Sequence, residues 1–547
     1  MKCIAALMVD LEHAPLGTRS RLAEPLAGKP VLRRTVERLL ACSRISSVHL
    51  LTTPSQRGGV ESLVSGLPVE IEPLRLPPSP YAELIRAGRW WGLDGWRGGV
   101  GGLSVFDEDA NVGALAALAA RQEADAVTVA PAAAAMIDPR LSDAMVAHFE
   151  TVGRTFELTF AQTPPGLSPL IVGRKLLEEL SHAAEPVGLI LAYNPDRPVA
   201  DLTGKECCYR PAGEIIEASG RLICDTRRSF ERVRELIEAG GEAWDAARVG
   251  SWLQLRTRTQ VEKVPSEIEI ELTTDAGAAE GNLLRPGGSE VPKRGPLSFD
   301  VVRAIADAVR DWDDVRIVLA GFGEPCAHPA FGEICRMLRP AAAALAVRTF
   351  ARFGADHVRS GDLQASEDAL FETPVDTVEV MVDAVSAVTY VRLHGVDAFT
   401  EVSERLESWL QRRVKAARAR PLIVPSFVKC NENLDEMEPF FENWQRRLGM
   451  VLVTGHSHYA RQRPHRAVTS MAPPQRSACK RVFSRLVVLA DGRVTTCDQD
   501  YQGAQSLGRL TDAALMDMWN ERRFVQIRAN DLSDVPLCAK CDEWHRP

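Results

Sequence analysis

Residues 267–273 read EIEIELT, an alternation of glutamate with isoleucine and leucine that predicts a β-strand. Two later stretches, 299–312 and 399–413, place apolar residues at three- and four-residue intervals, which is typical of amphipathic helices. Six strand–helix units in about two hundred residues predict a partial or complete (β/α) barrel, with ligand chemistry at the carboxyl ends of its strands. The further apolar strand-like runs lie at 316–319, 345–349, 377–382, 422–428 and 451–454.

The sequence before this segment shows a second alternation of strand and helix patterns. Apolar runs at 3–9 and 48–53 flank a helix-like stretch at 30–41, and a long helix is expected at 229–238. Strands that alternate with helices predict an α/β, Rossmann-like domain with a mainly parallel sheet and helices on both faces. Shorter apolar runs at 126–130 and 188–192 are further strand candidates.

Length and composition set the remaining limits. A chain of 547 residues is long enough for three folding units, which we expect at 1–255, 256–465 and 466–547. Apolar residues make up 45% and charged residues 25%, which is the balance of a folded globular protein rather than a disordered one. The net charge of -8 is spread without basic blocks, so we expect no nucleic-acid partner.

Location and the use of cysteine follow from the same sequence. No apolar run approaches the roughly 20 residues of a membrane span, so we expect a cytoplasmic protein without a membrane partner. Twelve cysteines do not form the dense framework of a small secreted domain. Clustered cysteines are therefore interpreted as metal ligands, and the scattered Cys3, Cys42 and Cys335 as small core residues.

Four cysteines near the C-terminus form the clearest constellation. Asp491-Gly492 between apolar runs predicts a β-hairpin that carries Cys479 and Cys497 near its two ends. The turn Cys538-Ala539-Lys540-Cys541 points two more sulfurs at one centre. Four soft ligands suit one zinc ion or one iron–sulfur cubane, and the spacing by itself fits both.

The surrounding residues resemble a known family. Cys497-Asp498-Gln499-Asp500, Ser506-Leu507-Gly508, Met518-Trp519-Asn520 and the final Leu537-Cys538-xx-Cys541 resemble the SPASM extension of radical SAM enzymes. The resemblance implies one auxiliary [4Fe-4S] cluster, with the metal ligands Cys479, Cys497, Cys538 and Cys541. The additional cysteines for a second cluster in the fuller SPASM pattern are absent from this sequence.

The barrel segment also resembles radical SAM enzymes, but it lacks their cysteines. The stretch 269–275 resembles the family's first strand, after which CxxxCxxC should bind a cluster that chelates S-adenosylmethionine. The three ligand positions are Ala276, Glu280 and Leu283, and one carboxylate cannot replace three thiolates. The loop Gly321-Phe322-Gly323-Glu324-Pro325 resembles the family's GGEP motif, which implies that Gly321, Gly323, Glu324 and Pro325 are cofactor-binding residues. The alternative interpretation is that this loop is structural.

The N-terminal segment resembles sugar nucleotidyltransferases, especially cytidylyltransferases. The resemblance lies in residues 17–22 and 25–32, where Arg19 and Lys29 match basic residues that bind a nucleoside triphosphate. Ala132-Ala133-Ala134-Ala135 stands where the family has a magnesium-binding aspartate, and a hard cation needs oxygen ligands. Asp225 remains as one carboxylate, and we expect nucleotidyl transfer to be lost.

The three segments together resemble the spiro-SPASM proteins of spirochaetes, a family without a clear activity. Because two successive domains lack catalytic ligands, we expect no catalytic residues and a pseudoenzyme that acts as a binding or assembly factor for a protein or peptide partner. The alternative is an enzyme of unknown reaction, which uses the cluster for electron transfer or the N-terminal cleft for a nucleotide or activated sugar. The ligand-position losses count against S-adenosylmethionine and nucleotide as cofactors, and the sequence does not indicate an oligomeric state.

Overall fold

The computed structural model describes residues 1–74, 81–109, 111–183, 195–196, 204–352, 367–373 and 375–546. The chain divides into two compact units, Met1–Gln260 and Val261–Pro547. The boundary expected after residue 255 lies within helix α11 (Ala246–Thr259), which belongs to the first unit. Residues from 466 onward belong to the same compact unit as the barrel segment. A separate third domain at 466–547 therefore remains a prediction.

The first unit is a mixed α/β domain built on a seven-stranded sheet. Strand β1 pairs in parallel with β4 and β6, which confirms the strands expected at 3–9, 48–53 and 126–130. The mainly parallel sheet is interrupted by β8, which runs antiparallel to both of its neighbours, β6 and β7. The run at 188–192 lies outside the described residues. In sheet order the strands are β5 (Glu70–Pro73), β4 (Val48–Thr52), β1 (Cys3–Met8), β6 (Ala126–Val129), β8 (Leu170–Gly173), β7 (Leu158–Ala161) and β9 (Cys208–Tyr209), with a separate pair β2 (Pro25–Leu26) and β3 (Lys29–Pro30).

Helices cover both faces of this sheet because alternate residues of its central strand point to opposite sides. Ala5 and Leu7 of β1 lie in one apolar core, while Ile4 and Ala6 lie in the other. Helix α10 begins at a capping box in which Thr226 and Ser229 bond each other's backbone N–H groups. The helices are α1 (Val31–Leu40), α2 (Arg57–Leu63), α3 (Ala82–Gly88), α4 (Phe106–Asp109), α5 (Val112–Arg121), α6 (Pro139–His148), α7 (Arg154–Phe156), α8 (Arg174–Ala183), α9 (Gly213–Ile216), α10 (Arg227–Glu238) and α11.

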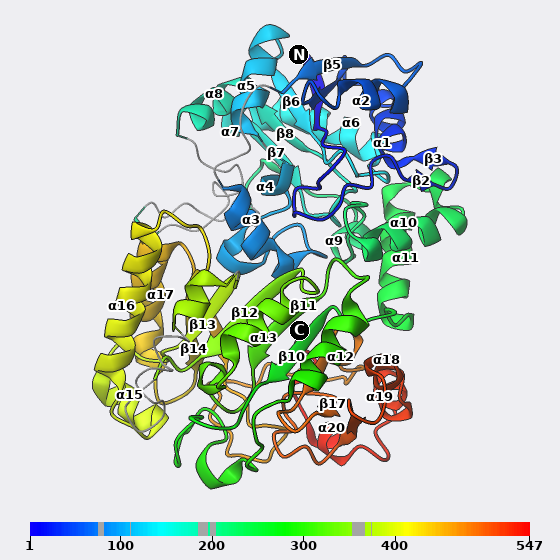
Figure 1. Ribbon diagram of the computed structural model, residues 1–547. Coiled ribbons are helices and arrows are strands. Elements are labelled where there is room, and N and C mark those ends of the chain that lie inside the picture. Colours follow the sequence, from blue (N-terminus) through cyan, green and yellow to red (C-terminus); the bar gives the residue numbers. More distant parts are fainter. Residues whose placement is uncertain are drawn as a thin grey trace. The chain divides into compact units, whose positions relative to one another are not determined.

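The second unit contains a nine-stranded sheet in which the six predicted barrel strands lie side by side in chain order (Figure 1). All neighbouring pairs from β10 to β15 are parallel. Among the described residues this sheet has two ends, at β15 and β18, so the barrel is partial. The strands are β10 (Glu267–Glu271), β11 (Arg316–Ala320), β12 (Ala344–Thr349), β13 (Thr377–Met381), β14 (Leu422–Lys429), β15 (Leu452–Gly455), β16 (Arg485–Val488), β17 (Arg493–Thr495) and β18 (Ser506–Arg509).

The alternation of EIEIE along β10 has a structural consequence. Ile268 and Ile270 join the apolar core together with residues of α12, which covers that face of the sheet. The glutamates occupy the opposite face, where they are buried and paired with arginines. The helices of this unit are α12 (Phe299–Val309), α13 (Phe331–Leu338), α15 (Ala387–His394), α16 (Phe399–Lys415), α17 (Met437–Leu448), α18 (Leu515–Trp519), α19 (Arg522–Arg528) and α20 (Pro536–Lys540).

The C-terminal hairpin continues the barrel sheet. Strand β16 pairs in parallel with β10, and Ile268 lies opposite Leu486. Val488, Trp519 and Phe524 belong to the same apolar core as the barrel strands. The cysteine-bearing segment therefore packs on the edge of the barrel at its first strand.

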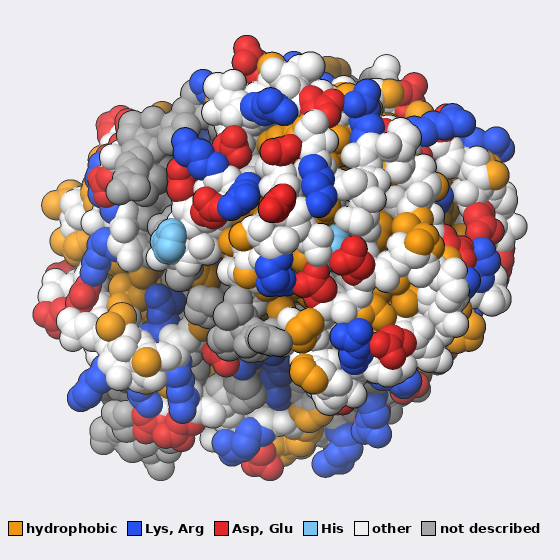
Figure 2. Space-filling model, turned by 90° about the horizontal axis from the view of Figure 1, so that it is seen from above, with side chains coloured by type: hydrophobic (Ala, Val, Ile, Leu, Met, Phe, Trp, Pro, Cys, Tyr) orange, Lys and Arg blue, Asp and Glu red, His pale blue; other side chains and the backbone are white. Residues whose placement is uncertain are grey.

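Two surface properties concern possible partners. Figure 2 shows acidic and basic side chains interspersed over the face that it presents, without an extended field of one sign. No helix among the described residues combines the length and apolarity that crossing a bilayer requires.

Candidate metal centre

The predicted hairpin is confirmed, and it carries the first two cysteines at its open end. Strands β16 and β17 are antiparallel, with Val487 opposite Thr495, and Gly492 takes a φ of +78° at the turn. Cys479 precedes β16 and Cys497 follows β17. The pairing of β16 with β17 thus brings the chain segments that carry the two cysteines to the same end of the hairpin.

The second pair of cysteines lies on α20 and just after it. The N–H of Cys541 donates to the carbonyl of Cys538 at 3.1 Å, which closes the CxxC turn. Arg476 donates to the Cys541 carbonyl at 2.7 Å and to the Cys538 carbonyl at 2.9 Å. The N–H of Lys480 donates to the Trp544 carbonyl at 3.2 Å. Backbone and arginine bonds on both sides of Cys479 therefore hold the CxxC turn beside the hairpin.

These four cysteines differ in exposure from the rest. Cys479, Cys497, Cys538 and Cys541 are half-buried, whereas the other eight cysteines of the chain are buried. The scattered Cys3, Cys42 and Cys335 belong to that buried group, with exposed fractions of 1%, 6% and 0%. Half-burial thus separates these four residues from the cysteines of the apolar cores.

The separation of the sulfurs bears on which centre they fit. Four sulfurs around one zinc at about 2.3 Å would lie roughly 3.8 Å from one another. Among the described residues, no three of these cysteines have sulfurs within 4.8 Å of one another. The thiolates of a cubane bind different iron atoms and therefore lie farther apart than ligands of one ion. Four soft sulfur donors suit either an iron–sulfur cluster or a zinc ion.

Three of the four thiols, those of Cys497, Cys538 and Cys541, lie in surroundings that disfavour a bare thiolate. Burial raises the pKa of the Cys538 thiol to about 12 and that of Cys541 to about 11. Burial likewise holds the pKa of Cys497 well above its usual range. Binding of a cation at this place must therefore displace protons and supply the positive charge that the thiolates lack.

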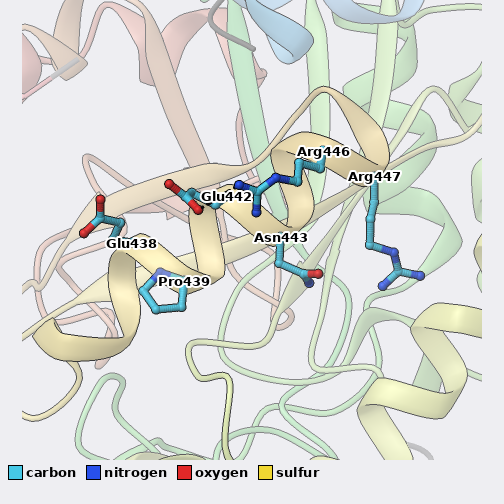
Figure 3. A pocket seen from close by; sticks show the side chains of 6 residues that line it. All are labelled: Glu438, Pro439, Glu442, Asn443, Arg446 and Arg447. Atoms are coloured by element: carbon cyan, nitrogen blue, oxygen red, sulfur yellow. Dashed lines mark hydrogen bonds and ion pairs between the residues drawn. The ribbon is translucent and has the colours of Figure 1, made fainter. Parts of the chain in front are cut away.

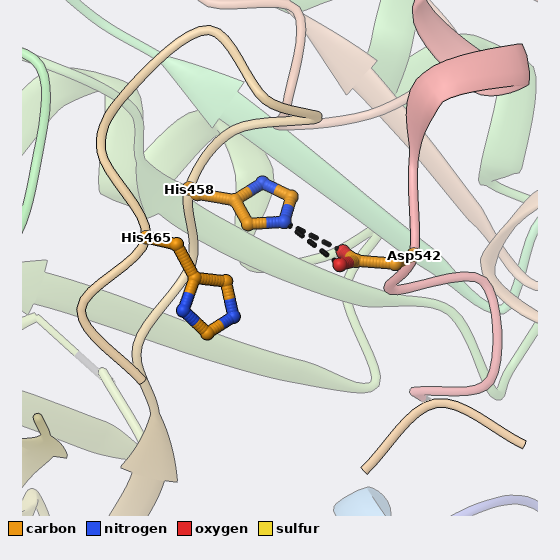
Figure 4. Close-up of side chains that lie close together, drawn as sticks. All are labelled: His458, His465 and Asp542. Carbon is orange, nitrogen blue, oxygen red and sulfur yellow. Dashed lines mark hydrogen bonds and ion pairs between the residues drawn. The ribbon is translucent and has the colours of Figure 1, made fainter. Parts of the chain in front are cut away.

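Two of the cysteines are followed directly by aspartates that have basic partners. Asp498, next to Cys497, accepts from Arg481 at 2.7 Å, and the same guanidinium lies 3.8 Å from the Cys497 sulfur. Asp542, next to Cys541, is paired with His458, whose Nε2 lies 2.8 Å from a carboxylate oxygen (Figure 4). Sequence reasoning missed these basic residues, although the repeated Cys-Asp pair was a signal that the cysteines need nearby positive charge.

His458, His465 and Asp542 lie close enough to suggest a second metal site (Figure 4). The Nδ1 of His458, however, accepts the N–H of Arg461 at 2.8 Å. In a neutral ring the proton then sits on Nε2, which donates to Asp542. A histidine that binds metal usually donates through its other nitrogen, so this tautomer favours an ordinary His–Asp hydrogen bond.

The loop that replaces the cysteine motif of the barrel is held by protein contacts. The side chain of Asn282 accepts the N–H groups of Leu284 and Arg285, both at 2.9 Å, and Leu283 donates its N–H to the Leu393 carbonyl at 2.8 Å. Glu280 accepts from the backbone and hydroxyl of Ser289. Of the three ligand positions, Glu280 stabilises this loop through its side chain and Leu283 through its backbone N–H.

Ala276 lines a cavity of about 500 Å³ at the carboxyl ends of β10 and β11. Phe322 is the contribution of the GFGEP loop to this lining. A Cβ on Gly321 would lie 2.6 Å from the Glu271 Cβ, and one on Gly323 would lie 2.2 Å from the Thr273 carbonyl oxygen. These two glycines permit close packing of neighbouring loops, which is the structural interpretation of the motif.

Glu324 and Pro325 are directed into the protein. Glu324 is fully buried and accepts from the Thr349 hydroxyl at 2.8 Å and from the Phe350 N–H at 2.9 Å. Pro325 begins a short 3-10 helix that Glu324 caps. Neither residue lines the cavity.

In the first unit, a cavity of about 280 Å³ lies at the carboxyl ends of β1 and β6 and is lined by Ala132, Ala133 and Asp225. Arg221 binds both carboxylate oxygens of Asp225, one of them at 2.8 Å, and also binds the buried Glu108, so Asp225 is already part of a buried ion-pair network. Arg19 is exposed, and the exposed Lys29 pairs with Glu37 at 2.7 Å. Neither basic residue lines this cavity.

Another hollow lies on α17, and a single helix supplies all of its lining residues. Its lining consists of six residues of that one helix, including Glu442 and Arg446, which form an ion pair at 3.0 Å (Figure 3). Their side chains do not converge on a common point from different elements (Figure 3). We therefore interpret it as a solvated helix face.

Comparison with known proteins agrees with the geometry of the cysteine site. Residues 479–542 match the SPASM iron-sulfur cluster-binding domain. The C-terminal part of the chain is therefore similar to iron–sulfur cluster-binding SPASM domains. An uncharacterised protein of Treponema pallidum (strain Nichols) is 25% identical over 290 residues, covering 52% of this chain and 79% of that protein.

Two solved structures give weaker likenesses. Streptococcus suis SuiB bound to the precursor peptide SuiA has a TM-score of 0.41 at 10% identity, covering 57% of this chain and 84% of SuiB. A cytidylyltransferase from Leptospira borgpetersenii serovar Hardjo-bovis (strain JB197) has a TM-score of 0.32 at 16% identity, covering 47% of this chain and 95% of the enzyme. TM-scores of this size do not establish a shared fold.

Proposed function

We propose that this protein holds one [4Fe-4S] cluster on Cys479, Cys497, Cys538 and Cys541. The observation that carries the proposal is the joining of the hairpin and the CxxC turn by Arg476 and by the Lys480–Trp544 backbone bond. The match of residues 479–542 to the SPASM domain supports iron over zinc. When bound, the cluster supplies a redox-active, soft-metal centre. The chain supplies the four thiolates and the polar groups around them.

The same proposal gives the barrel a non-catalytic role. The positions that would bind a second cluster are Ala276, Glu280 and Leu283, and hydrogen bonds fix their loop. We therefore propose a binding or assembly factor for a protein or peptide partner rather than a radical SAM enzyme. Exposed apolar side chains on and beside α15, namely Val385, Val388 and Val391, support a protein partner.

The test is the metal content of protein purified without oxygen. We expect about four irons per chain, and a loss of iron when any one of the four cysteines is replaced by alanine. The matched controls are Cys3→Ala, Cys42→Ala and Cys335→Ala, which should keep their iron because these thiols are buried elsewhere. One zinc per chain without iron would keep the ligand set and overturn the cofactor. A stable protein without bound metal after anaerobic reconstitution would overturn the site itself.

A second candidate function is an enzyme that uses one of the two cavities. The observation in its favour is that each unit has a cavity at the carboxyl ends of its strands, of about 500 Å³ and 280 Å³. Anaerobic titration with S-adenosylmethionine and with CTP and magnesium separates the two functions. Micromolar binding of either, or release of pyrophosphate from CTP with a sugar phosphate, would favour the enzyme.

A further inference from the structure

Arg481 connects the two ends of the hairpin that carry Cys479 and Cys497. It lies two residues after Cys479, and its Nη1 donates to Asp498 at 2.7 Å. The same Nη1 lies 3.8 Å from the Cys497 sulfur. The side chain is 12% exposed, so its charge acts on the sulfur with little screening by water.

Asp498 places a negative charge on the same sulfur. Its Oδ1 lies 3.0 Å from the Cys497 Sγ, where the thiol of the metal-free protein donates. In the cluster-bound protein that proton is lost, and a thiolate then faces a carboxylate. Arg481 is the cation that lies within hydrogen-bonding distance of the carboxylate and close to the thiolate. Arg485 and Arg348 also act on Asp498 through their charges, but Arg481 is the cation that hydrogen-bonds it. Removal of Arg481 would therefore weaken the compensation of the two anions.

The charges of Arg481 and Asp498 affect the reduction potential of the cluster, because the charge of the cluster changes when it is reduced. A cubane with four thiolates carries a net charge of about −2 when oxidised and −3 after it takes up one electron, with no bond broken. A nearby cation stabilises the more negative state and raises the reduction potential, whereas a nearby anion lowers it. Arg481 and Asp498 therefore act on the potential in opposite directions.

We propose that Arg481 is a positioning residue that sets the reduction potential of the cluster and holds Cys497 against the repulsion of Asp498. This inference deepens the proposed function and rests on it, because it concerns the cluster on the four cysteines. It assigns a role to a residue outside the ligand set. The redox partner in the test below is dithionite, which supplies the one electron through a mediator.

The experiment is an anaerobic potentiometric titration followed by electron paramagnetic resonance of the reduced cluster, with iron content measured on each sample. We expect Arg481→Gln to lower the midpoint potential and Asp498→Asn to raise it. Arg481→Lys should return the potential toward the wild-type value, because it restores the positive charge. A purely structural role would not give shifts of opposite sign.

The matched control is Arg493→Gln. Arg493 pairs with Asp491 at 2.8 Å in the turn of the same hairpin, so its loss removes an equivalent ion pair away from the cysteines. Its potential should equal that of the wild type. Equal potentials in all variants that retain iron, or shifts of one sign in Arg481→Gln and Asp498→Asn, would overturn this inference alone. A wild-type protein without iron would overturn the cluster proposal and this inference together. If Arg481→Gln does not fold, Asp498→Asn decides, because a midpoint potential that does not rise in that variant would overturn the inference.

Discussion

Glu271 and Arg294 form a buried bidentate ion pair, with Nε–Oε1 at 2.6 Å and Nη2–Oε2 at 3.0 Å. The Glu271 carboxylate also accepts the N–H of Phe322 in the GFGEP loop and the N–H of Ala490 in the cysteine-bearing hairpin, both at 3.1 Å. Arg294 in turn donates to the Tyr501 carbonyl at 3.1 Å. One carboxylate at the end of β10 thus joins the barrel strand, the GFGEP loop and the cysteine-bearing hairpin.

Replacement of Arg294 by alanine should destabilise the second unit. The change leaves the Glu271 charge buried without its cation, which typically costs about 3–5 kcal/mol. The measurement is denaturant unfolding followed by a probe in the second unit, because two compact units need not unfold together. The control Arg303→Ala removes the exposed pair with Asp300 and should change the free energy of unfolding by less than about 1 kcal/mol. Similar effects of the two substitutions would contradict the role of Glu271 as a buried junction.

The pH dependence of stability should contain a contribution from Glu324. Burial raises the pKa of Glu324 to about 7, above the ordinary value of a glutamate. Because the folded state holds this proton more tightly than the unfolded state, the contribution is fully present below the unfolded pKa. It is lost as the pH rises through about 7. Glu324→Gln keeps an acceptor for Thr349 without a titratable group.

The measurement is the free energy of unfolding of wild type and Glu324→Gln at pH 5 and pH 8. The variant should gain stability relative to the wild type as the pH rises, by an amount on the order of 2–3 kcal/mol. Glu333→Gln, on the surface of α13, serves as the control and should follow the wild type. A difference that stays constant with pH would show that Glu324 is charged in the folded protein over this range.

Reductive cleavage of S-adenosylmethionine should not occur, and three new cysteines should not restore it. The variant with Ala276→Cys, Glu280→Cys and Leu283→Cys recreates the motif in sequence. Its loop remains held by Asn282 and by the Leu283–Leu393 backbone bond. We expect about four irons per chain and no 5'-deoxyadenosine above a no-protein control with dithionite. About eight irons per chain in the variant would show that the loop adapts and that only the cysteines are missing.

Replacement of Arg476 by alanine should make the cluster easier to remove. The side chain binds the carbonyls of both cysteines of the CxxC turn, and loss of such supporting groups commonly weakens metal binding 10- to 100-fold. The measurement is the rate of iron loss to a chelator under anaerobic conditions, expected to rise about tenfold. The control Arg509→Ala removes a bond to the Asp491 carbonyl at the hairpin turn and should leave the rate unchanged. Equal rates for all three proteins would remove Arg476 from the site.

Local patterns in the sequence predict much of this protein. The alternation at 267–273 and the Asp491-Gly492 turn predict β10 and the β16–β17 hairpin, because strand and turn preferences depend on near neighbours. The same patterns do not predict that β16 joins β10. That pairing links residues about two hundred positions apart. It depends on the free edge of β10, which pairs with β11 on its other side.

The candidate site divides in the same way. The sequence by itself determined the four cysteines, the hairpin that joins two of them and the absence of cysteine at 276, 280 and 283, since these are matters of residue type and short spacing. Only the tertiary structure decided that Arg221 binds Asp225, that Arg476 binds the CxxC turn and that Arg481 contacts both Cys497 and Asp498. An arginine looks the same in a sequence whether it is solvated or buried. Its partner is fixed by which strands and loops the fold brings together, and the energy of the pair depends on how far water is excluded there.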